Sequence, residues 1–167
     1  MADLLDACGR GDTARARALI EGGANVNTTA NDGETPLHNA SRYGYTETAA
    51  MLVEGGANVN TTDNNGWTPL HCTSVHGYTE TAAMLVEGGA DINTTNNVGN
   101  TPLHHASVNG HTETAAMLVE GGANVNTTDN DGDTPLHLAS RYGHTETAAM
   151  LRDYHAKVSN CFTTSNY

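Results

Sequence analysis

The chain has 167 residues, of which 37% are hydrophobic and 5% aromatic, and its formal net charge at pH 7 is -12. Seven Lys and Arg residues stand against nineteen Asp and Glu residues. This balance argues against a nucleic-acid partner or an anionic membrane surface, because basic side chains supply most of the affinity for both.

Membrane and secretion signals are missing from the sequence, and the cysteines do not form a motif. No apolar run approaches the ~20 residues needed to span a bilayer, and the N-terminus lacks a basic region followed by an apolar stretch. Cys8, Cys72 and Cys161 are far apart without Cys-x-x-Cys spacing, which favours neither a disulfide framework nor a zinc site. We expect a soluble, unsecreted protein that is cytoplasmic if its origin is natural.

The first predicted element is a diverged unit, residues 1–29. Its closing sequence, Gly22-Gly23-Ala24-Asn25-Val26-Asn27, recurs unchanged at 55–60 and 121–126 and with two changes at 88–93. The unit lacks, however, the tetrapeptide that opens each later unit. We predict that it caps the N-terminal end of the units that follow.

Four units of 33 residues come next, at 30–62, 63–95, 96–128 and 129–161. Each contains Thr-Pro-Leu-His, at Thr35–His38, Thr68–His71, Thr101–His104 and Thr134–His137. A fixed period of this size is typical of a solenoid, in which stacked units together bury a core that none could form alone. The period predicts one elongated domain over residues 1–161.

The unit 63–95 shows the expected structure of each repeat. Asp63-Asn64-Asn65-Gly66 is a turn signature, and Thr68 and Pro69 fit the N-cap and first position of a helix. This helix should run from Pro69 to Val75 or His76 and end at Gly77. A second helix should begin at Thr79-Glu80 and end at Gly88-Gly89.

The last unit departs from the pattern near its end. Arg152-Asp153-Tyr154-His155 replaces the Val-Glu-Gly-Gly of earlier units, which gives this unit the more polar outer face that a C-terminal cap requires. Residues 162–167 carry no repeat signal. We predict that they form a disordered tail.

Two antiparallel helices and a turn per 33 residues, with Thr-Pro-Leu-His before the first helix and Gly-Ala-Asp-Ile-Asn after the second, resemble the ankyrin repeat. The resemblance covers the chain through Cys161. It implies an all-α solenoid of antiparallel helix pairs with β-turn or hairpin tips. It also implies that turn tips and first helices line a concave groove that binds protein partners.

The repeats serve as internal replicates that separate framework from variable positions. Residues 46–62 recur unchanged as 112–128, whereas turn tips and first helices differ between units. The variable residues include Trp, Tyr and Arg, the types that dominate interface hot spots. The candidate partner-binding residues are Asp32, Glu34, Arg42, Tyr43, Asn65, Trp67, Val75, His76, Val98, Asn100, Val108, Asn109, Asp131, Asp133, Arg141 and Tyr142.

Trp67 is the leading candidate because it is the only Trp in the chain. We expect an exposed contact residue, and its replacement by Ala to leave thermal stability nearly unchanged. The alternative is that its indole packs on the adjoining turn. Across the units, the predicted groove is apolar in its middle and charged at its ends.

The resemblance implies a non-catalytic protein-protein interaction module for a protein or peptide partner, and the variable residue types support this hypothesis. The alternative is a structural scaffold without a selected partner, which could be engineered or weakly self-associating. The near identity of the repeats fits either recent natural duplication or consensus construction, and both origins stay open.

Other chemistry receives little support. The four motif histidines follow the repeat period, and the resemblance implies a structural hydrogen-bonding role for them. Asp129-Asn130-Asp131-Gly132-Asp133 fails the spacing of a calcium loop. Nucleophile-elbow and phosphate-loop motifs are missing as well, so we expect no enzyme activity, cofactor or metal.

Asn-Thr-Thr recurs at Asn27, Asn60, Asn93 and Asn126, and each is formally a glycosylation sequon. We interpret these residues instead as turn formers, because Asn and Thr side chains bond to local backbone. Asn93, after Asp91-Ile92, also resembles the asparagines of ankyrin repeats that an oxygen-dependent hydroxylase modifies. Asn60 and Asn126 match that context less well.

Overall fold

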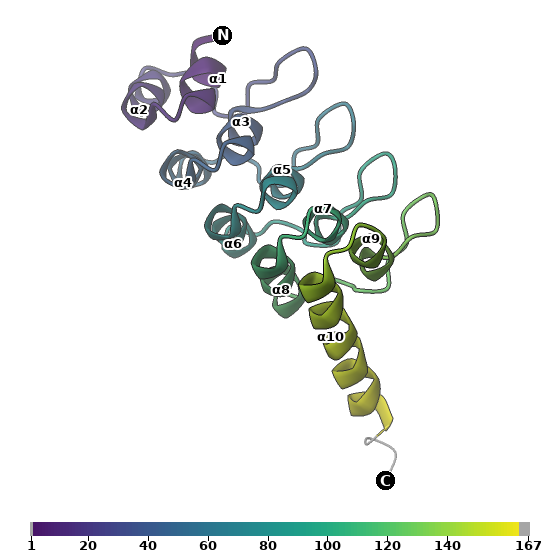
Figure 1. Cartoon of the computed structure of the whole chain (residues 1–167). Coiled ribbons are helices and arrows are strands. Elements are labelled where there is room, and N and C mark those ends of the chain that lie inside the picture. The colour runs from purple at the N-terminus through teal and green to yellow at the C-terminus, as the bar shows by residue number, and fades with distance from the viewer. Residues whose placement is uncertain (1, 164–167) are drawn as a thin grey trace.

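The structure of the chain is a computed structural model that describes residues 2–163. Within this range the chain forms ten α-helices and no strand (Figure 1). The helices are α1 (Ala2–Gly9), α2 (Thr13–Glu21), α3 (Pro36–Arg42), α4 (Thr46–Glu54), α5 (Pro69–His76), α6 (Thr79–Glu87), α7 (Pro102–Val108), α8 (Thr112–Glu120), α9 (Pro135–Arg141) and α10 (Thr145–Thr163).

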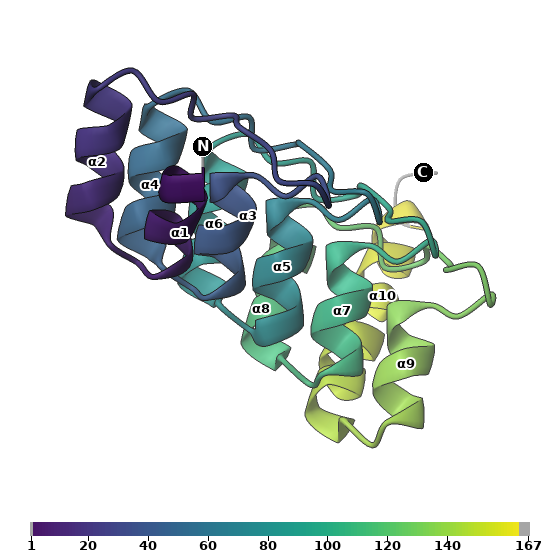
Figure 2. The ribbon, with the colours of Figure 1, turned by 90° about the horizontal axis from the view of Figure 1, so that it is seen from above.

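The helices form two layers that run the length of the stack. The first helix of each unit contacts the first helix of the next, and the second helices do the same in a parallel row. The loops between units project from the side of the first helices as a row of turn tips (Figures 1 and 2). This arrangement confirms the predicted all-α solenoid of helix pairs.

The helix boundaries follow from the capping residues. In α5, the Thr68 hydroxyl accepts the backbone N–H of His71, and Nδ1 of His71 accepts the backbone N–H of Thr68 at 3.1 Å. Pro69 occupies the first helical turn, where a missing N–H costs nothing. The same reciprocal cap opens α3, α7 and α9. The bounds predicted for α5 and α6 are confirmed.

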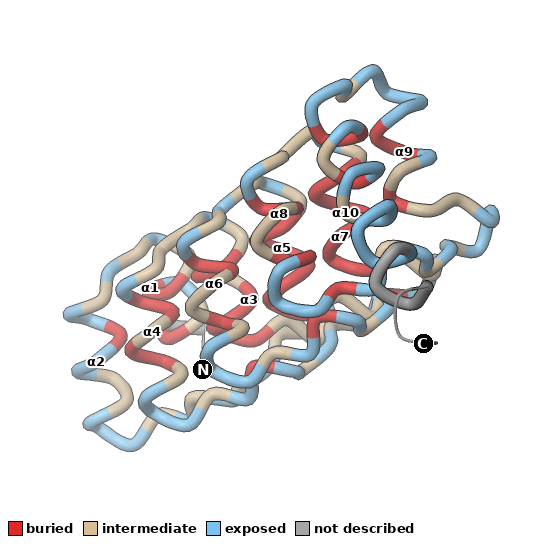
Figure 3. The backbone as a smooth tube through the Cα atoms, turned by 90° about the horizontal axis from the view of Figure 1, so that it is seen from below, coloured by how far each residue is buried: buried red, intermediate tan, exposed pale blue. Residues whose placement is uncertain are grey.

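The core is a single apolar layer between the two rows of helices (Figure 3). Leu70 of α5 and Leu85 of α6 are fully buried, as are their counterparts in neighbouring units. Ala82 and its counterparts are equally buried, and their small side chains let the helices approach closely. A core made of Leu and Ala explains why so few aromatic residues suffice.

The motif histidines tie each unit to the next. Because Nδ1 accepts the N–H of the capping Thr, the ring proton is on Nε2, which donates to a carbonyl of the following unit. His137 belongs to the last unit, and its side chain is 59% exposed. The inter-unit bonds are His38 to Trp67 at 2.8 Å, His71 to Asn100 at 3.0 Å and His104 to Asp133 at 3.0 Å.

Asparagines of the Asn-Thr-Thr segments make a second set of inter-unit bonds. The Asn60 amide donates to the Gly89 carbonyl at 3.1 Å and accepts the Asp91 N–H at 2.8 Å. Asn27 and Asn93 bridge in the same way. The turn interpretation is therefore too narrow, since these side chains also connect neighbouring units.

Replacing Asn60 by Ala should lower the free energy of unfolding by about 1–2 kcal/mol, because two inter-unit hydrogen bonds are lost. Asn126 offers the matched control. Within residues 2–163 its side chain forms no hydrogen bond to another unit, and its backbone N–H bonds only the Asn124 side chain of its own turn, so Asn126→Ala should change stability by less than about 0.5 kcal/mol. Urea titrations followed by circular dichroism measure both, and equal losses would contradict the bridging role.

The last helix is longer than predicted. Helix α10 has 19 residues, compared with 9 in α8, and it continues through Phe162 and Thr163. Earlier second helices end at a Gly-Gly pair whose second member has a positive φ, whereas Tyr154 and His155 stand there in α10. The helix therefore enters the predicted tail, and the rest of that tail, 164–167, lies outside the described residues.

Candidate interaction surface

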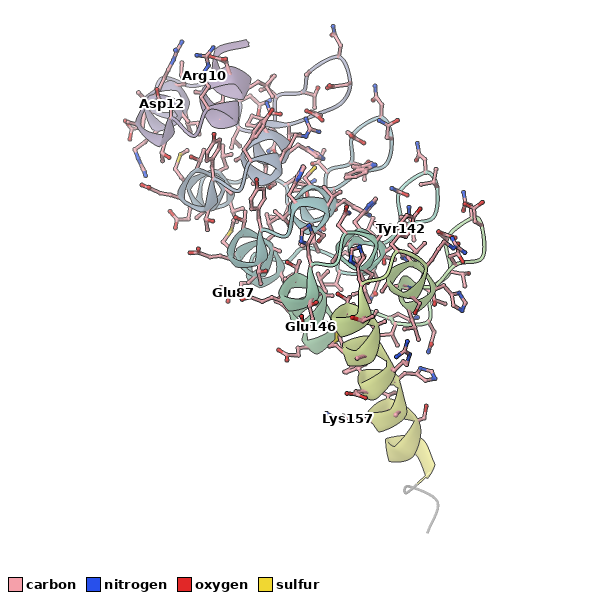
Figure 4. All side chains as sticks on the ribbon, viewed as in Figure 1. Arg10, Asp12, Glu87, Tyr142, Glu146 and Lys157 are labelled. Atoms are coloured by element: carbon pink, nitrogen blue, oxygen red, sulfur yellow. The ribbon has the colours of Figure 1, made fainter. Side chains whose placement is uncertain are left out.

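The candidate residues come together on one surface, formed by the four turn tips (residues 32–34, 65–67, 98–100 and 131–133) and the C-terminal ends of α3, α5, α7 and α9. We call it the tip–helix surface. None of the residues predicted from the sequence is fully buried. Tyr43 (52% exposed), Val98 (56%) and Tyr142 (60%) are the most exposed large apolar side chains among them (Figure 4 labels Tyr142).

Ion pairs connect the turn tip to the first helix in the first and last of the four 33-residue units, 30–62 and 129–161. Arg42 contacts Glu34 through both terminal guanidinium nitrogens, and Arg141 contacts Asp133 in the same way at 2.6 and 2.7 Å. These bonds raise the pKa of both arginines, and the Arg141 guanidinium lowers the pKa of Asp133. Glu34 and Asp133 are thus each neutralised by an arginine of their own unit.

The same two positions are uncharged in the middle units. Trp67 and Val75 replace the acid and the arginine in one unit, and Asn100 and Val108 replace them in the next. All four side chains are partly exposed. The middle of the tip–helix surface therefore offers apolar and amide groups that no ion pair occupies.

Trp67 is half-buried, where the sequence predicted an exposed side chain. Its ring centroid lies 4.4 Å from the His105 ring of the next unit and 5.9 Å from His71. The Asp63 carboxylate accepts the backbone N–H of Trp67 at 2.8 Å, which fixes the turn. The alternative prediction was that the indole packs on the adjoining turn. In the structure, the indole contacts rings of the first helices α5 and α7 instead.

The His105 ring packs against the Trp67 ring. His105 was not among the site residues predicted from the sequence. It is 8% exposed, its ring lies 5.6 Å from His71, and its Nε2 is 3.3 Å from the Asn96 amide nitrogen. Burial, with smaller effects of His71 and His104, lowers its pKa to about 3. The sequence could have indicated His105 as a candidate, because the residue at this position differs in every unit: its counterparts are Asn39, Cys72 and Leu138.

The first unit extends the surface at its N-terminal end. A cavity of about 270 Å³ is lined by Leu5, Asp6, Gly9, Arg10, Asn39 and Tyr43. Within it, Arg10 Nε lies 2.8 Å from the Asp6 carboxylate. A larger cavity of about 390 Å³ lies away from this surface, between α8 and α10.

The described residues offer no metal site and no membrane span. Among them, no group of three or more His, Cys, Asp or Glu could hold a metal ion. None of the helices in the range 2–163 is both long and apolar enough to cross a membrane. Cys8 and Cys72 are buried free thiols, and burial raises their pKa values to about 11 and 12.

Comparison with known proteins gives one family. A family model described as ankyrin repeats in three copies matches residues 4–96 and 88–160, which together span nearly the whole chain. A search of curated proteins finds no significant match.

Proposed function

The chain belongs to the ankyrin-repeat family, whose members are generally protein-protein interaction modules, and from this premise we propose that it binds a protein or peptide on its tip–helix surface without catalysis. We further propose residues 1–161 as the binding domain. The two unpaired thiols fit our expectation of a cytoplasmic location for a natural protein.

One observation carries the proposal: Trp67 packs against the rings of His71 and His105 and stays partly exposed in the uncharged middle of the tip–helix surface. Trp is the residue most enriched in binding hot spots, and a ring that is already held in place loses little conformational entropy on binding. The leucines of the framework at Leu37, Leu70 and Leu103 are fully buried in the core, and the framework residue Tyr78 is 37% exposed.

Replacing Trp67 by Ala should weaken binding of a selected peptide at least 10-fold, as expected for a central hot spot. Peptides are selected on the immobilised protein from a displayed library of random 12-residue sequences. Affinities are then measured by titration, and Trp67→Phe should keep part of the affinity. If Ala and Phe variants bind as tightly as the wild type, the partner site lies elsewhere.

The same substitution should also lower the free energy of unfolding, by about 1–2 kcal/mol, because the indole packs against His105. This revises the expectation that stability stays nearly unchanged. Binding is therefore compared at a temperature where circular dichroism shows both variants folded. A scaffold without a partner would select no peptide, and self-association would appear as a molar mass that rises with concentration.

A further inference from the structure

We propose that the partner segment carries an apolar side chain flanked on both sides by Lys or Arg. This inference rests on the proposed function, since it names the chemistry of the ligand for the same surface. Among the described residues, the basic side chains of the tip–helix surface form ion pairs within the protein, whereas two acidic side chains do not.

The cations of this surface are already paired with acids of their own unit. Arg10 bonds Asp6 at 2.8 Å, Arg42 bonds Glu34, and Arg141 bonds Asp133 at 2.6 Å. An acidic partner would have to compete with these carboxylates for each guanidinium. The arginines that the sequence offered as partner contacts therefore do not favour an acidic ligand.

Two carboxylates at the outer turn tips have no such counter-ion. Asp32 and Asp131 are exposed, and no basic side chain in the described range forms an ion pair with either. Asp32 uses one carboxylate oxygen to accept the Glu34 N–H at 3.1 Å, which leaves the other oxygen free. Their counterparts in the middle units are the uncharged Asn65 and Val98.

The surface thus presents unbalanced negative charge at its two ends and Trp67 with Val98 between them. A ligand that matches it has an apolar centre and positive flanks. An exposed ion pair contributes about 0.2–1 kcal/mol, so two such contacts correspond to about a 2- to 30-fold gain in affinity at low salt. The gain should disappear at high ionic strength, because salt screens exposed charges.

The chain is acidic as a whole, so the experiment must separate these two carboxylates from general attraction of basic peptides. Asp32→Asn combined with Asp131→Asn removes both, and the chain itself carries Asn at the equivalent position 65. Glu54→Gln with Glu87→Gln is the matched control. Both glutamates are exposed at the ends of second helices, away from the turn tips (Figure 4 labels Glu87).

Each protein selects peptides from the random 12-residue library, and the recovered sequences are counted. The wild type and the Glu54/Glu87 variant should recover peptides with Lys and Arg on both sides of an apolar residue. The Asp32/Asp131 variant should lose most of this excess and bind wild-type-selected peptides about 2- to 30-fold more weakly at low salt. Fluorescence of Trp67, the only Trp, reports whether the peptides engage this surface.

Each other outcome overturns the inference in a distinguishable way. Recovered peptides that shift Trp67 fluorescence but carry no basic excess contradict the charge argument alone and leave the proposed function standing. An equal loss of basic peptides in both double variants assigns the effect to overall charge. If the wild type recovers no peptide above the Trp67→Ala variant, the proposed function fails, and this inference fails with it.

Discussion

Acidification from pH 7.5 to pH 4.5 should destabilise the fold by several kcal/mol, because buried histidines must stay neutral. Burial lowers the pKa of His38, His71, His104 and His105, to about 4 for His71 and about 3 for His105. The inter-unit bonds to backbone carbonyls oppose this shift only in part. The unfolded chain binds protons near the ordinary histidine value of 6.5, well above these folded values.

The sign follows from proton counting. Between the folded and unfolded pKa values the unfolded state holds more protons, so stability is complete above about pH 6.5 and falls as the pH decreases toward the folded value. Each buried histidine contributes up to about 1.4 kcal/mol per pH unit in this window. By pH 4.5, His71 and His105 together should remove on the order of 5 kcal/mol, which rivals the total stability of many domains.

Urea titrations at intervals of half a pH unit measure this slope. His105→Leu should reduce the slope by up to about 1.4 kcal/mol per pH unit, which corresponds to one proton. Leu is compatible with this position, because the fourth unit carries Leu138 there. His137→Asn, which removes an exposed histidine of the last unit, is measured for comparison. An unfolding free energy that stays constant from pH 7.5 to 4.5 would contradict the role assigned to these histidines.

The sequence was sufficient for the parts of the fold that depend on local chemistry. Thr68 and Pro69 set where α5 begins and Gly77 where it ends, because caps act through bonds to residues a few positions away. The 33-residue period then placed each unit in register with the next. The extension of α10 could also have been predicted, since Tyr154-His155 removes the glycine that ends earlier second helices.

The contacts among the candidate residues could not be predicted from the sequence. The stack of Trp67 on His105 joins residues 38 positions apart in different units, and no local pattern indicates which rings will meet. The ion pair of Glu34 with Arg42 spans a turn tip and a helix end, so each residue alone is consistent with a free contact residue. Variability between units indicated the candidate residues, whereas only the structure shows which of their charges are paired within the protein.

The loop between the two helices of a unit should be sensitive to a single added methyl group. Gly77 has a φ of +75°, and a Cβ there would lie 2.5 Å from Nδ1 of His111 in the next unit. Gly143 has nearly the same φ, +76°, with no atom of the described structure within 4 Å of its Cβ position. The two glycines therefore separate backbone strain from inter-unit packing.

Gly143→Ala should lower the free energy of unfolding by about 1 kcal/mol, the cost of a left-handed conformation for an L-residue. Gly77→Ala should lose about 1–3 kcal/mol more, because the methyl group displaces the His111 ring and strains its 3.1 Å bond to the Val75 carbonyl. In a double-mutant cycle, His111→Ala should remove this excess. Equal losses for the two glycine variants would show that the ring yields freely, and that this loop contributes little to the stacking of units.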